Sequence, residues 1–107
     1  MCHCLSCQRR TGSVFGVQAR FDRDKMTVEG RSAEFVRVGD AAGRITSHFC
    51  PTCGSTVYWE LDTIPGFVTV AVGAFADPRF PPPRVSVYEE RRHSWAAMPA
   101  LNIEHIE

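Results

Sequence analysis

The sequence lacks an excess of charge of either sign. Its 107 residues contain 12 Lys and Arg against 12 Asp and Glu. Affinity for a phosphate backbone depends on surplus positive charge, so we expect no nucleic-acid partner. Two short basic clusters, Arg9-Arg10 and Arg91-Arg92-His93, are more typical of solvated surface, although such pairs can also hold a small anion.

Long hydrophobic runs are missing as well. The longest strongly apolar stretch, residues 67–76, is about half of the ~20 residues that a membrane-spanning helix needs. The chain does not open with a basic segment followed by an apolar one, as a secretory signal would. We therefore expect no membrane partner and a cytoplasmic location.

The chain is too short for a second hydrophobic core and has no internal repeat, so we expect one domain over residues 1–107. Short segments rich in β-forming residues recur at regular spacing, with turn residues between them. This pattern predicts an all-β or mainly β fold with one or two short helical turns. We expect strands at residues 14–21, 25–28, 33–38, 44–49, 56–61, 67–72 (buried on both faces) and 85–90, a turn at 39–43, and helical turns at 6–10 and 95–98.

The five cysteines fall into two clusters. Cys2, Cys4 and Cys7 lie within six residues, and Cys50-Pro51-Thr52-Cys53-Gly54 has the spacing of a zinc knuckle, whose tight turn aims two sulfurs at one point. An odd number of closely spaced thiols suits metal ligation in a reducing compartment better than a disulfide framework. A redox dithiol is less favoured, because no β-α-β pattern surrounds either cluster. We therefore predict that all five cysteines are zinc ligands.

Two ways of sharing the ligands remain open. Cys4, Cys7, Cys50 and Cys53 could form one closed, structural site. Alternatively, Cys2, Cys4 and Cys7 could form a three-thiolate site with an open fourth position. The second arrangement points to chemistry, because a closed site leaves no room for a substrate.

A three-thiolate zinc site carries a net negative charge, which tempers its Lewis acidity and favours the ionisation of an incoming thiol over metal-hydroxide chemistry. Arg9 and Arg10 could offset that charge or bind a substrate carboxylate. Arg44, after a glycine turn, and His48, just before the knuckle, are further candidates for binding the substrate, although His48 could equally be a packed strand histidine. His3 lies between two ligands and points away from them, so we expect it to act around the site rather than as a ligand.

In combination, these motifs resemble the glutathione-dependent formaldehyde-activating enzyme (GFA) family, also called the CENP-V/GFA domain. The resemblance covers nearly the whole chain. It is carried by Cys2-His3-Cys4, Cys7, Thr11-Gly12-Ser13, the segment Phe49-Cys50-Pro51-Thr52-Cys53-Gly54-Ser55, Val72-Gly73, Asp77-Pro78, the proline run 81–83 and Trp95.

The resemblance implies a β-tent fold, in which small antiparallel sheets are pinned by zinc. In the family, the cysteines matched by Cys2, Cys4 and Cys7 form the catalytic zinc site, and those matched by Cys50 and Cys53 belong to a structural one. Family members usually complete the structural site with a C-x-C pair on an N-terminal strand, and we expect this strand to be missing here. Ser86 stands near the place of a histidine in some relatives.

The resemblance also implies a carbon–sulfur lyase of the S-(hydroxymethyl)glutathione synthase type, with zinc as cofactor and a small thiol such as glutathione and an aldehyde as partners. The alternative is a non-catalytic zinc-stabilised binding module. In that case, an apolar surface exposed where the missing strand would have lain could form a homodimer.

Overall fold

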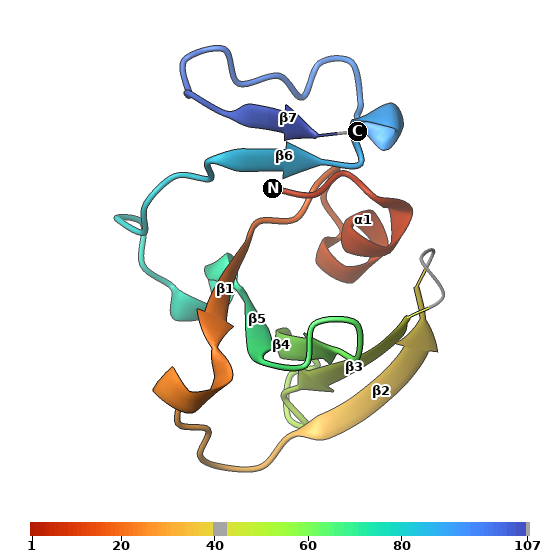
Figure 1. Cartoon of the computed structure of the whole chain (residues 1–107), viewed down its shortest axis with the longest axis vertical. Coiled ribbons are helices and arrows are strands. Elements are labelled where there is room, and N and C mark those ends of the chain that lie inside the picture. Colours follow the sequence, from red (N-terminus) through yellow and green to blue (C-terminus); the bar gives the residue numbers. More distant parts are fainter. Residues whose placement is uncertain (40–42, 107) are drawn as a thin grey trace. The chain divides into compact units, whose positions relative to one another are not determined.

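The computed structural model describes residues 1–39 and 43–106, and the chain divides into two compact units (Figure 1). One unit contains Met1–Gln18 and the residues from Ala76 onward, and the other contains Ala19–Phe75. The elements, in chain order, are α1 (Leu5–Thr11), β1 (Gln18–Asp22), η1 (Arg23–Lys25), β2 (Ala33–Val38), β3 (Arg44–Phe49), β4 (Thr56–Leu61), β5 (Phe67–Ala71), η2 (Val72–Phe75), β6 (Val85–Val87), η3 (Glu89–Arg91) and β7 (Glu104–Ile106), where η marks a 3-10 helix.

A five-stranded sheet in the order β1-β5-β4-β3-β2 forms the frame of the unit of residues 19–75. The pairs β2–β3, β3–β4 and β4–β5 are antiparallel. The register between β3 and β4 shifts at His48 and Phe49, directly before Cys50. The prediction of a mainly β fold with an antiparallel sheet is confirmed.

The core of this sheet lies along β5. Val68, Thr69, Val70 and Ala71 are all buried, and Trp59 of the neighbouring β4 is buried too. A strand in the middle of a sheet can be covered on both faces, which explains why its sequence is a nearly continuous apolar run. The prediction of a strand at 67–72 buried on both faces holds for residues 68–71, whereas Phe67 is 41% exposed and Val72 begins η2.

The other unit combines α1 with a two-stranded sheet of β6 and β7. Helix α1 begins after Cys4 and ends at Gly12, which has a φ of 69° and donates its N–H to the carbonyl of Gln8 at 2.8 Å. Glycine closes the helix there because this left-handed conformation costs it little. Strands β6 and β7 run parallel, unlike those of the larger sheet.

Several expected boundaries are wrong. No strand forms at 25–28, where Lys25 ends a 3-10 turn, and the strand expected at 14–21 is limited to β1. The strand expected at 85–90 stops at Val87, because Tyr88 adopts a left-handed conformation with a φ of 56° and the chain turns into η3. No helical turn occupies residues 95–98, Val72 begins η2, and β7 was not expected.

The turn expected at 39–43 falls partly outside the described residues, since 40–42 are not described. The expected turn at 6–10 is present as α1. Among the described residues, no helix combines the length and apolar character needed to cross a bilayer.

Candidate metal centre

The thiols of Cys2, Cys4 and Cys7 come together in the unit that contains α1. Their sulfur atoms all lie within 4.8 Å of one another. Zinc with Zn–S bonds of about 2.3 Å in a tetrahedral arrangement needs sulfurs about 3.8 Å apart, so only small shifts would bring these three onto one ion. In the part of the chain that the structure describes, this is the only such group of three potential ligand side chains. The donor set therefore fits zinc.

Backbone pairing fixes the first of these cysteines. Cys2 exchanges two hydrogen bonds with Gly16, at 2.8 and 2.9 Å, and also bridges to Val87 of β6. The N–H of His3 donates to the carbonyl of Val87 at 3.1 Å. The metal loop (residues 2–7) thus begins between two backbone partners, Gly16 and Val87.

The helix places the other two cysteines. Cys4 is the N-cap of α1, and its Sγ accepts a hydrogen bond from the N–H of Cys7 at 3.4 Å. This is the position where a side-chain oxygen usually caps a helix, since the first N–H groups have no partner within it. The sequence C-x-x-C therefore closes the cap with sulfur and brings both thiols to the helix start.

The three thiols share protons unequally. Hydrogen bonds with Cys2 and Cys7 lower the pKa of Cys4 far below its usual value, so Cys4 is the first of the three thiols to ionise. The hydrogen bond between Cys2 and Cys4 raises the pKa of Cys2 well above the usual range. The bond with Cys2 lowers the pKa of Cys7, but the bond with Cys4 and burial outweigh it and leave that pKa raised. At neutral pH the metal-free cluster therefore carries one thiolate and two thiols.

Arg10 supplies positive charge beside this cluster. Its charge acts to lower the pKa of Cys7, one turn earlier on α1. A Cβ atom at position 16 would lie 2.5 Å from Nη2 of Arg10 and 3.4 Å from Cβ of Cys7. Gly16 therefore leaves the space in which the guanidinium lies, a role that sequence reasoning missed because nothing in the sequence links residue 16 to residue 10. Arg9 is on the same helix and exposed.

His3 is buried and turned away from the sulfurs. Its Nε2 lies 3.1 Å from Oγ of Ser86 on β6, and its backbone carbonyl accepts a hydrogen bond from Nε2 of Gln8 at 2.8 Å. Burial lowers the pKa of His3, so the ring is neutral at pH 7. These contacts tie the middle of the metal loop to β6 and α1, and a role of His3 around the metal stays a prediction.

Cys50 and Cys53 lie in the other unit, on the turn between β3 and β4. The N–H of Gly54 donates to the carbonyl of Cys50 at 2.8 Å, and Gly54 has a φ of 80°, which suits glycine. Cys53 is exposed, and a hydrogen bond with Ser55, whose Oγ lies 3.3 Å from Sγ, lowers its pKa. The knuckle turn is thus formed, but no third ligand from the described residues of this unit joins it.

The remaining two candidates, Arg44 and His48, lie on β3 in the same unit as the knuckle. Arg44 is exposed at the start of the strand. His48 is buried, with Nε2 at 3.0 Å from Glu60 and Nδ1 at 3.5 Å from Ser32, and its ring stacks on Tyr58 at 4.2 Å between centroids. These contacts are those of a packed strand histidine.

Comparison with known proteins identifies the family of the chain. The family model of the glutathione-dependent formaldehyde-activating enzyme matches residues 1–91, which include both cysteine clusters. A search of curated proteins gave no match. Since the family model spans most of the sequence, the chain belongs to the glutathione-dependent formaldehyde-activating enzyme family.

Proposed function

We propose that this chain is a zinc-dependent carbon–sulfur lyase-type enzyme that reversibly joins a small thiol, such as glutathione, to an aldehyde, as S-(hydroxymethyl)glutathione synthase does. The observation that carries the proposal is the gathering of Cys2, Cys4 and Cys7 into one three-sulfur cluster. In the forward reaction a carbon–sulfur bond forms, the carbonyl π bond breaks, and the proton of the thiol ends on the new hydroxyl oxygen.

The chain's own residues prepare the site for this reaction. Cys2, Cys4 and Cys7 would hold the zinc, which would supply an open coordination position where an incoming thiol gives up its proton. Cys4 is already ionised, so one ligand is ready without the loss of a proton. Arg10, next to Cys7, offsets part of the negative charge that three thiolates bring together.

Two further groups of residues have proposed roles, in substrate binding and in a structural zinc site. Arg9 shares a helix with Arg10 and is exposed, so it is free to meet an anionic group of the substrate. The exposed Arg44 is a further candidate for the same role, whereas the contacts of His48 with Glu60 and Tyr58 support a structural role more than substrate binding. Cys50 and Cys53 would form part of a structural zinc site, a role supported by their formed knuckle turn.

Exchange between free glutathione and its formaldehyde adduct tests the activity. This exchange also occurs without enzyme, so the quantity to measure is the added rate, by NMR exchange spectroscopy with ¹³C-formaldehyde. We expect the zinc-loaded chain to accelerate it and Cys7→Ser to remove the acceleration, while the control Cys53→Ser retains it. A zinc-loaded wild-type chain that adds nothing to the free rate would contradict the proposal.

A zinc-stabilised dimerisation module is the second candidate, and one observation favours it. Strand β2 is an edge of the five-stranded sheet, and Phe35, Val36 and Val38 on it are exposed by 52%, 51% and 71%. Exposed apolar edge strands invite pairing with another chain. Mass measurement by light scattering over a concentration series tests this, and a strict monomer would count against it.

A further inference from the structure

A pocket lies in the same unit as the metal loop but is not lined by Cys2, Cys4 or Cys7. Its volume is about 290 Å³, and its lining includes His3. The volume is near the lower limit of small-molecule sites, so an occupant would be small. The pocket is therefore distinct from the three-sulfur cluster, although the two share the backbone of the loop.

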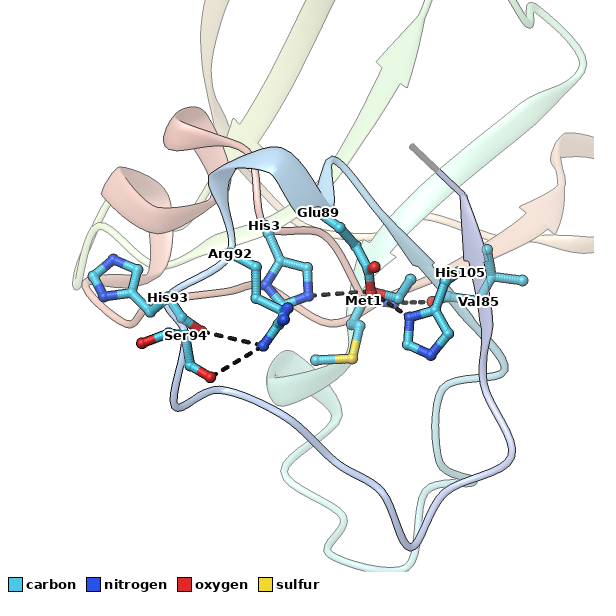
Figure 2. Close-up of polar contacts among 9 residues, drawn as sticks. Met1, His3, Val85, Glu89, Arg92, His93, Ser94 and His105 are labelled. Carbon is cyan, nitrogen blue, oxygen red and sulfur yellow. Dashed lines mark hydrogen bonds and ion pairs between the residues drawn. The ribbon is translucent and has the colours of Figure 1, made fainter.

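The polar part of the lining comes mainly from β6, η3 and β7. Glu89 contacts Nδ1 of His105, and hydrogen bonds from His105 and Ser86 lower the pKa of Glu89 (Figure 2). Ser86 in turn lies 3.1 Å from Nε2 of His3. The carboxylate of Glu89 is thus already occupied by partners within the protein, and it is not available to a cation from outside.

Arg92 differs from these residues because it forms no ion pair, although its charge also acts to lower the pKa of Glu89. Its Nη1 donates to the backbone carbonyls of His93, at 3.5 Å, and Ser94, at 3.2 Å (Figure 2). In residues 1–39 and 43–106, no carboxylate lies within 4.0 Å of its guanidinium. A guanidinium has five N–H donors in a fork that matches a carboxylate, so most of this capacity remains unused.

The rest of the lining is apolar and includes Met98, Leu101 and Ile103. The side chains of these three residues are only partly exposed, so they offer a hydrocarbon surface that water contacts poorly. A ligand that covers them gains the free energy of removing that surface from water. The lining therefore combines an arginine that forms no ion pair with an apolar wall.

We propose that this pocket binds a small monocarboxylate with a hydrocarbon body, whose carboxylate pairs with Arg92 and whose body lies on Met98, Leu101 and Ile103. The pocket offers an arginine without an ion-pair partner, a carboxylate that is already hydrogen-bonded, and an apolar wall, and this combination favours a carboxylate ligand over a cation or a neutral molecule. This binding site goes beyond the proposed function and does not depend on it, because it needs neither the aldehyde nor the thiol.

Hexanoate is a suitable probe, followed in amide NMR spectra of the full, zinc-loaded chain. We expect saturable shifts at residues of the pocket, weaker shifts with 1-hexanol, and no comparable binding of hexylamine. Arg92→Gln should weaken hexanoate binding about tenfold or more, and Arg92→Lys should restore part of it. The matched control is Arg91→Gln, which removes the neighbouring exposed arginine, outside the pocket lining.

Four results would overturn the proposal: no saturable shift with hexanoate, shifts that map to residues outside the pocket, hexylamine binding as tightly as hexanoate, or equal weakening by Arg91→Gln and Arg92→Gln. The amide spectrum of each variant without ligand shows whether it is folded like the wild type. If Arg92→Gln alters that spectrum, the comparison of Arg92→Lys with the wild type and the preference for hexanoate over hexylamine still decide the question.

Discussion

Zinc binding to the three-sulfur cluster should release about two protons per ion at neutral pH. Three ordinary thiols, with pKa values near 8.5, would release about three. Here the pKa of Cys4 is lowered, while those of Cys2 and Cys7 are raised, so we expect one ligand to have lost its proton before the metal arrives and two to have kept theirs. The apparent affinity for zinc should therefore rise about a hundredfold per pH unit rather than about a thousandfold.

The direction of this pH dependence follows from the number of protons bound in the metal-free and zinc-bound states. The metal-free cluster holds two protons that the zinc-bound cluster does not, so raising the pH favours the zinc-bound state. Because the pKa of Cys4 lies so low, the release should stay near two protons from mildly acid pH up to pH 8. Below that range the competition from protons weakens zinc binding further, since both thiols must still be ionised.

Calorimetry in buffers of different ionisation enthalpy counts the released protons directly. The chain should carry Cys50→Ser and Cys53→Ser, so that the knuckle contributes neither metal nor protons. A release near three protons per zinc would refute the claim that the cluster holds a preformed thiolate. A release near one would show instead that a second ligand is ionised before zinc binds.

Three further variants test the packing and the charges around the site. Gly16→Ala places a Cβ 2.5 Å from Nη2 of Arg10, the mobile end of a flexible side chain, so it should cost less than about 1 kcal/mol in urea unfolding but move the guanidinium and weaken zinc binding. Gly66→Ala, with no atom within 4 Å, should leave zinc binding unchanged, and equal effects of the two variants on zinc binding would contradict the packing argument. Val68 on β5 is 0% exposed, so Val68→Ala should lower the free energy of unfolding by about 2 kcal/mol or more. Val38 is 71% exposed, so Val38→Ala should change it by no more than about 0.5 kcal/mol. Similar losses in the two variants would place the core elsewhere. Arg10→Gln should weaken zinc binding several-fold at low salt, and the loss should shrink as salt rises; a loss independent of salt would argue against a charge effect.

Much of the fold could be predicted from local sequence. The strands β2, β3 and β4 match the predicted segments because β-rich runs between turn residues are a strong local signal. The wrong strand predictions lie where one residue's backbone conformation ends a strand or where two distant segments pair. Tyr88 in a left-handed conformation ends β6 early, and the pairing of β7 with β6 joins residues that are far apart in the sequence.

The candidate site was predictable for a related reason. The spacing of Cys4 and Cys7 specifies a capped helix start, so their approach is a local property. The position of Cys2 depends on Gly16 and Val87, and the burial of His3 depends on Ser86. These partners are distant in the sequence, and a single sequence read alone gives no signal that pairs them.

X-ray absorption at the zinc edge tests the central claim most directly, namely that Cys2, Cys4 and Cys7 form a zinc site able to accept an external thiol. The measurement uses the chain with Cys50→Ser and Cys53→Ser, loaded with one zinc, before and after the addition of glutathione. The account predicts about three sulfur ligands at about 2.3 Å before the addition and about four after it. A count of four sulfurs without glutathione, or a count that glutathione does not change, would contradict it.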